Sequence, residues 1–278
     1  NGMIIYLSKW DGSSWQTVPV STPSKQIKTN QFTVKNCQEK TQGSGRNRKT
    51  VTVCDTTYTY IKQYAKAREV HSIVSNSGVI TTVFVDTTSH YQGYYNLFNT
   101  SLELLKAETA IDTSMSVIDL ATDGSDLYIG YENRSTEHYG PYVKHATIGS
   151  SSLSFDNSTQ FKTPITPGSI SYHISIAAKA GKVFAIIDDK NKPSLSQTHV
   201  FHLDGGKWKP YGENELPYFK VSFYKIHNYY LRGSLPDICI SDNENVYISM
   251  LAWENAGGNG NNFGPLVMKY VADNWTVH

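Results

Sequence analysis

Acidic residues follow the second strand-like segment of several similar stretches of this chain. They are Asp86, Glu132, Asp188 with Asp189, and Glu254, and amide or hydroxyl side chains come close behind them. Carboxylates beside amides suit sugar hydroxyl groups, or a hard cation such as calcium, which prefers oxygen ligands. This pattern predicts a rim of carboxylates that binds a glycan. Calcium is a candidate cofactor, and we expect no other cofactor. The alternative is that strands end where solvent begins and acidic residues stand there for solubility.

Aromatic and histidine side chains near the same loops extend the predicted site. Flat rings flanked by hydrogen-bonding groups suit both sugar faces and hot spots of protein interfaces. The alternative for Trp253 is packing between sheets. His173 and Asp237 fall near the starts of first strands, close to a central channel. The candidate ligand-binding residues are therefore Glu132, His138, Tyr139, His173, Asp188, Asp237, Trp253 and Glu254.

Catalytic signatures of the common kinds are missing from the sequence. No Ser or Cys stands in a nucleophile-elbow motif, and no His-Glu-x-x-His occurs. We therefore predict a non-enzymatic binding module with no catalytic residues and with a glycan or protein partner. The alternatives are an adhesive or structural domain of a larger protein and a glycoside hydrolase-like enzyme. Separated acids can hydrolyse glycosidic bonds, and the candidates for that role are Asp119, Glu132, Asp188 and Asp237.

Charge and composition exclude several classes of partner. The 278 residues carry a net charge of +1, and only 18% are charged. No strong field would recruit nucleic acid or an anionic membrane surface. No apolar run approaches the ~20 residues that a membrane-spanning helix needs. We therefore expect no nucleic acid partner and no membrane span.

Cysteines and glycosylation sequons favour an oxidising, extracellular environment. Cys37 and Cys54 flank a polar, basic segment, residues 41–49, and a disulfide closing this hairpin is expected. The alternative is two reduced thiols on neighbouring strands, and Cys239 is expected as a small buried residue. The candidate glycosylation sites are Asn99, Asn133, Asn157 and Asn274. The sequence thus predicts a secreted or cell-surface, disulfide-containing glycoprotein.

Repeated hairpins are the elements that must position these residues. Residues 3–18 turn at Asp11-Gly12, and residues 267–277 repeat the pattern of an apolar strand, a turn with Asp and then a Trp. Residues 200–211 form a third copy. Apolar hairpins precede the later copies, at 72–85, 118–131, 174–187 and 238–248. Copies lie roughly 45–65 residues apart, the range of propeller blades with loop insertions.

A four-stranded meander cannot bury both of its faces alone, so these copies must pack against each other. The expected fold is an all-β propeller, one domain over 1–278 with about five four-stranded antiparallel blades. The expected blades are 1–66, 67–108, 114–162, 170–215 and 235–278. A two-sheet sandwich is the alternative architecture. The first hairpin could also complete an upstream blade or lie against the C-terminal one.

The chain resembles β-propeller repeat proteins over most of its length, but through generic motifs only. It has no Gly-His and Trp-Asp pair of the WD40 kind, no regular kelch Gly-Gly doublet and no Asp-box of sialidases. The arabinanase-like five-bladed fold uses three carboxylates for hydrolysis. That likeness would give Asp119, Glu132, Asp188 and Asp237 such roles, although none of that family's motifs surrounds them.

Overall fold

The computed structural model describes residues 5–42, 49–64, 67–161, 164–165, 171–189, 197–211, 232–256, 260–271 and 274–277. Within these ranges the chain forms strands and one short 3-10 helix, η2 (Thr159–Phe161). The described part contains no helix long and apolar enough to cross a membrane.

Four sheets each contain four antiparallel strands that are adjacent in sequence, as predicted for propeller blades. Blade A comprises β5 (Ala67–Val74), β6 (Ile80–Asp86), β7 (Gln92–Phe98) and β8 (Leu104–Ala110). Blade B comprises β9 (Met115–Asp123), β10 (Asp126–Asn133), β11 (Gly140–Ile148) and β12 (Leu153–Phe155). Blade C comprises β13 (Ser171–Lys179), β14 (Lys182–Asp189), β15 (Gln197–Asp204) and β16 (Lys207–Pro210). Blade D comprises β17 (Arg232–Ile240), β18 (Val246–Ala256), β19 (Gly260–Val271) and β20 (Asn274–Val277).

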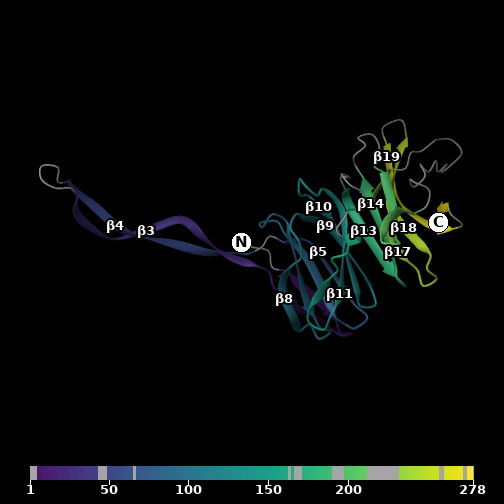
Figure 1. Cartoon of the computed structure of the whole chain (residues 1–278), viewed down its shortest axis with the longest axis horizontal. Helices are drawn as coiled ribbons and strands as arrows, with labels where there is room; N and C mark the ends of the chain where they lie inside the picture. Colours follow the sequence, from purple (N-terminus) through teal and green to yellow (C-terminus); the bar gives the residue numbers. More distant parts are fainter. Residues whose placement is uncertain are drawn as a thin grey trace.

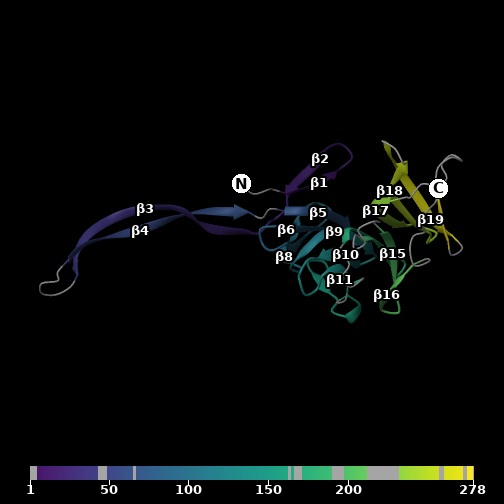
Figure 2. The same cartoon turned by 90° about the horizontal axis from the view of Figure 1, so that it is seen from above.

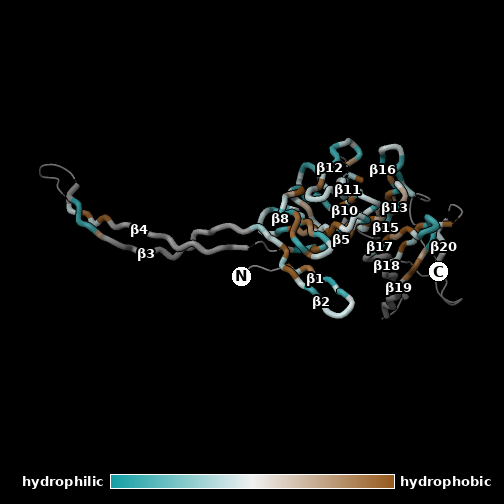
Figure 3. Tube along the Cα trace, turned by 90° about the horizontal axis from the view of Figure 1, so that it is seen from below, coloured by the Kyte–Doolittle hydropathy of each residue, from teal (hydrophilic) through white to brown (hydrophobic). Residues whose placement is uncertain are grey.

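The blades stack face to face through their first strands, so the fold is a β-propeller. Strand β9 contacts both β5 and β13, and β13 contacts β17, which lines the four inner strands up in one row (Figure 1). Apolar clusters fill the spaces between A and B, between B and C, and between C and D. Hydrophobic segments accordingly run through the sheets, whereas many turns are hydrophilic (Figure 3). Burial on both faces explains why the inner strands are apolar at nearly every position.

Residues 1–66 do not form the expected four-stranded blade. Their described part makes two separate ribbons, β1 (Tyr6–Trp10) with β2 (Trp15–Pro19), and β3 (Ser24–Gln42) with β4 (Lys49–Tyr64). Strands of 19 and 16 residues pair only with each other and cannot match the five-residue strands beside them in one sheet. The long ribbon extends away from the blades (Figure 2).

The hairpin β1–β2 packs against blade A, and not against blade D as one alternative had it. Leu7 and Val18 contact the apolar cluster that contains Phe84 and Phe98. The Lys9 ammonium donates to the carbonyl oxygen of Thr100 at 2.7 Å, which ties the hairpin to the β7–β8 turn. One face of the hairpin is therefore fixed on blade A.

The cysteines differ in their surroundings. Cys37 is disulfide-bonded, and its partner in the register of β3 and β4 is Cys54. Cys239 is a free and exposed thiol, which corrects the expectation of a buried residue. Strand β17 alternates here, so that Ile238 faces the core and Cys239 faces away from it.

Candidate functional site

One polar side chain on each inner strand joins a continuous row, which we call the hub row: His71, Asp119, Ser175 and Asp237. They stand on β5, β9, β13 and β17, in the order in which these strands lie side by side. Three of them interrupt otherwise apolar stretches, as in Ile118-Asp119-Leu120 and Ile174-Ser175-Ile176. This repeated polar residue within an apolar strand is the sequence signal for the row.

Ser175 links two carboxylates from different blades. Its hydroxyl lies 2.8 Å from Oδ2 of Asp119 and 2.7 Å from Oδ1 of Asp237. A hydroxyl has one hydrogen and can donate it to only one carboxylate at a time. Ser175 therefore connects the two carboxyl groups through one hydroxyl, although they belong to different blades.

Main-chain donors fix both carboxylates. The N–H of Ile176 donates to Asp119 Oδ2 at 2.9 Å, and the N–H of Ile238 donates to Asp237 Oδ1 at 2.9 Å. Gly130 lies opposite Asp119 in the register, and a Cβ there would stand 2.8 Å from the Ile176 side chain. Blade C can therefore approach β9 closely enough for the Asp119 contacts only because position 130 is glycine.

A β-bulge precedes the hub residue on every inner strand. The register shifts fall between Arg68 and His71, opposite Tyr131 and Glu132, between Ser171 and Ile174, and between Ser234 and Asp237. Two bulge residues adopt left-handed backbone, Glu69 with φ 48° and Val117 with φ 49°. A β-branched residue at positive φ is strained, and both strain and bulges accumulate where side chains must be re-aimed at functional sites.

The hub row is reachable from solvent. The side chains of His71 and Asp119 are partly exposed, and Asp237 is exposed. His71 Nδ1 lies 3.8 Å from Asp119 Oδ1, so a protonated imidazole would add a positive charge beside that carboxylate. Two neighbouring carboxyl groups that a ligand can reach from solvent can act as a general acid and a general base.

The predicted rim of carboxylates is not open to a ligand in blades A and B. Asp86 is 2% exposed and accepts hydrogen bonds from the N–H and hydroxyl of Thr88, which close a turn. Glu132 is fully buried and pairs with Arg134 at 3.3 Å. Both carboxylates are thus buried and have partners two residues further along the chain.

Some of the other predicted ligand-binding residues lie in or next to the hub row, and others do not. Asp237 belongs to the hub row, and the half-buried His173 stands at the bulge just before Ser175. Tyr139 is half-buried in the loop between β10 and β11. The side chains of Asp188, Trp253 and Glu254 lie outside the described part, although their strands β14 and β18 are placed.

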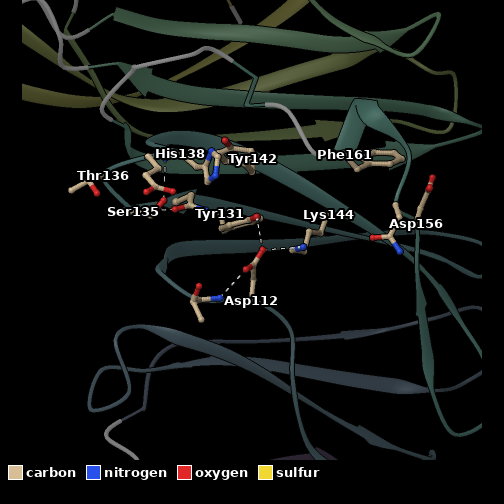
Figure 4. A pocket seen from close by; sticks show the side chains of 13 residues that line it. Asp112, Tyr131, Ser135, Thr136, His138, Tyr142, Lys144, Asp156 and Phe161 are labelled. Carbon is tan, nitrogen blue, oxygen red and sulfur yellow. Dashed lines mark hydrogen bonds and ion pairs between the residues drawn. The ribbon is translucent and has the colours of Figure 1, made fainter.

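A cavity of about 450 Å³ opens in blade B beside the β10–β11 loop, and His138 lines it (Figure 4). Asp112 Oδ2 accepts from the Tyr131 hydroxyl at 3.2 Å and pairs with the Lys144 ammonium at 2.9 Å. Burial and the nearby Asp112 charge raise the pKa of Tyr131, which keeps the phenol neutral. The Asp112 group is thus a tie between the blades, and its carboxylate and cation already neutralise each other.

Glycosylation and metal binding stay predictions. Asn157 is exposed, whereas the Asn99 amide donates to Glu103 at 2.6 Å and the Asn133 side chain accepts from the Ser135 N–H. The Asn274 side chain is outside the described part. Among the described residues no group of three or more His, Cys, Asp or Glu could hold a metal ion, and calcium stays a prediction.

No protein-family model and no curated protein sequence matches the chain. Solved structures resemble its fold. An α-L-arabinanase of Penicillium chrysogenum, complexed with arabinobiose, has a TM-score of 0.49 at 8% identity over 76% of this chain and 66% of its own. A putative exo-β-1,3-galactanase of Bifidobacterium bifidum has a TM-score of 0.44 at 9% identity over 82% of each chain. An ulvan lyase has a TM-score of 0.43 at 11% identity over 78% of this chain and 66% of its own.

These findings correct the prediction of a non-enzymatic binding module. The three structures named above are those of glycan-cleaving enzymes, so the enzymatic alternative replaces the main prediction. The chain spans just under two thirds of the length of the arabinanase. A likeness at such identity concerns the fold alone, so the chemistry of this chain rests on the hub row.

Proposed function

We propose that this chain is an enzyme that cleaves glycosidic bonds of a polysaccharide at the hub row. The observation that carries the proposal is the pair of carboxylates, Asp119 and Asp237, bridged by the single hydroxyl of Ser175. Glycoside hydrolysis needs one carboxyl group that gives a proton to the leaving oxygen and one ionised carboxylate near the sugar. Two carboxyl groups joined by one hydroxyl place both of the required groups beside a single bound sugar linkage.

We assign a role to each carboxylate from its contacts. Asp119 receives the Ile176 N–H on the oxygen that faces Ser175 and has His71 near its other oxygen, so both of its oxygens have a partner within the hub row. Asp237 is exposed, and its Oδ2 accepts no hydrogen bond from the described residues. Asp237 is therefore the general acid, Asp119 is the carboxylate that activates water or stabilises the developing positive charge, and Ser175 is a positioning residue.

An extracellular location fits this function. A polysaccharide is too large to enter most cells intact, and the disulfide at Cys37 suits an oxidising compartment. We expect the full-length product to be exported, with Asn157 as the glycosylation candidate that is open to solvent. Peptide mapping of the native secreted protein with and without reduction tests both points.

The test of the function is turnover of soluble arabinan, galactan, xylan and ulvan, followed as new reducing ends. Asp119→Asn and Asp237→Asn should each lower the rate by about 10²-fold or more, the usual size of a general acid–base contribution. Asp204→Asn is the matched control, because Asp204 is an exposed acid paired with Lys209 on the turn of β15 and β16. Circular dichroism checks the fold of each variant. Unchanged rates in both the Asp119→Asn and Asp237→Asn variants, or no cleavage of any of these polymers by the parent protein, would contradict the proposal.

A further inference from the structure

The outward face of the hairpin β1–β2 exposes three large aromatic side chains. Tyr6 is 59% exposed, Trp10 is 50% exposed and Trp15 is 67% exposed. Tryptophan is usually largely buried because its ring gains much free energy on leaving water. Several exposed rings on one small surface are typical of a binding surface and not of a passive one.

The register places these rings on one face. Trp10 lies opposite Trp15, Ser8 opposite Thr17, and Tyr6 opposite Pro19. Alternate residues of a strand share a face, and the Ser8 and Thr17 hydroxyl groups lie 2.8 Å apart, as side chains on one face must. We call this face the aromatic platform: Tyr6, Ser8, Trp10, Trp15, Thr17 and Pro19.

The platform is held rigidly. Leu7 and Val18 on the opposite face pack on blade A, and the Lys9 ammonium is bonded to the Thr100 carbonyl oxygen. In the turn, Asp11 accepts from the N–H groups of Ser13 and Ser14, each at 2.8 Å. Binding by such a surface loses little backbone conformational entropy, because the hairpin is held in place beforehand.

We propose that the aromatic platform binds a single chain of a neutral polysaccharide, as a second site apart from the hub row. The face contains no charged side chain, so it complements an uncharged ligand. Tryptophan and tyrosine rings accept the apolar C–H face of a sugar, while the Ser8 and Thr17 hydroxyl groups can bond to sugar hydroxyl groups. The proposal does not depend on catalysis at Asp119 or Asp237.

The size of the platform argues against a protein partner. Two five-residue strands offer a face roughly 17 Å long and two strands wide. A stable protein interface takes about 800 Å² and 20–30 residues from each partner, whereas the platform offers six residues. A sugar chain two or three units long matches such a strip, and a second copy of this chain does not.

The angle between the two tryptophan rings restricts the kind of polysaccharide that can bind. Their ring centroids are 5.7 Å apart, and the ring planes are inclined by 57°. A flat crystalline surface cannot contact both inclined rings at once, but a twisted, soluble chain can. The expected ligand is therefore a soluble neutral polysaccharide and not a crystalline one.

The experiment measures polysaccharide binding by the Asp237→Asn variant, so that no substrate is consumed. A failure of the proposed catalytic function therefore does not affect this result. The probes are soluble arabinan, galactan and hydroxyethyl cellulose, with microcrystalline cellulose and dextran sulfate for comparison, in affinity electrophoresis and tryptophan fluorescence. Trp10→Ala and Trp15→Ala should each weaken binding to a soluble neutral probe by about tenfold, and the double variant should abolish it. Leu104→Ala, which removes an exposed apolar side chain from blade A, should leave it unchanged.

Three outcomes would overturn the inference. One is equal affinity of the double variant and its parent for every neutral probe, or no binding by the parent. Another is stronger binding to dextran sulfate than to any neutral probe. The third is self-association, seen by sedimentation velocity, that the double variant loses while polysaccharide binding persists, since the platform would then join two copies of the chain.

Discussion

Two hairpins at opposite ends of the described chain share one sequence pattern and use it in opposite ways. In β1–β2 the cross-strand aromatic pair nearest the turn is Trp10 with Trp15, and in β19–β20 it is Tyr270 with Trp275. The ring centroids are 5.7 Å apart in the first pair and 5.2 Å in the second. Yet Trp275 is 7% exposed, whereas Trp15 is 67% exposed.

The difference lies in what covers the ring and not in the hairpin. Trp275 belongs to the apolar cluster between blades C and D, where Tyr211 packs against both Tyr270 and Trp275. On β1–β2 the equivalent face points away from blade A, and its aromatic side chains are exposed in the described structure. A propeller motif that serves as core in one blade is thus a surface in this hairpin, because no described blade covers its rings.

The largest expected difference is in stability, between the alanine variants of the two equivalent tryptophans. Trp275→Ala should lower the free energy of unfolding by about 3–5 kcal/mol, because it opens a cavity between the blades. Trp15→Ala should change it by no more than about 0.5 kcal/mol, as expected of an exposed side chain. Urea unfolding followed by circular dichroism measures both. Equal losses would mean that the two hairpins are not used differently.

A smaller loss of stability is expected from phenylalanine at the buried site, where it distinguishes the volume of the ring from its polar N–H group. The Trp275 Nε1 is buried and finds no hydrogen-bond partner among the described residues. Trp275→Phe removes that unpaired donor together with part of the ring, so its cost should stay below about 1.5 kcal/mol. At the exposed site, Trp15→Phe should leave stability unchanged and retain part of the polysaccharide binding. A loss at position 275 as large as that of the alanine variant would point instead to an unseen hydrogen bond.

The smallest effect concerns the turn of the exposed hairpin and its response to pH. Hydrogen bonds from the Ser13 and Ser14 N–H groups lower the pKa of Asp11 from its ordinary value of 3.8. A lowered pKa in the folded state means that this contribution is complete above the ordinary value and declines as pH falls below it. Exchange of the Ser13 and Ser14 amide hydrogens should therefore stay slow, relative to unprotected amides, from pH 7 to about 4 and lose protection below that. In Asp11→Ala that protection should be absent at every pH, and a parent profile with equal protection at pH 3 and pH 7 would contradict the assignment.

Much of the architecture was predictable from residues close together in the chain. Turn residues such as Asp11-Gly12 and alternating apolar segments predict hairpins, because turn type and strand period are local properties. The long ribbon β3–β4 escaped this reasoning. Four strand-like stretches suggest a blade, and nothing local says that two of them continue past any neighbouring sheet.

The functional site was predictable only in part, for the same reason. Asp119 and Asp237 were candidates, but the rim interpretation also included Glu132, which folding buries completely. Ser175 carried no sequence signal beyond its polarity within an apolar strand. Its importance comes from contacts with residues 56 and 62 positions away, which no local pattern encodes.

By itself the sequence determined the strands, their turns and which residues of a hairpin face each other, since these follow from neighbours a few positions apart. Only the tertiary structure decided that three blades bring Asp119, Ser175 and Asp237 within hydrogen-bonding distance. It also decided that one tryptophan of a repeated pair is core and the other surface. Both outcomes depend on which sheet packs against which, and that is fixed by burial of whole faces between blades and not by any single stretch of chain.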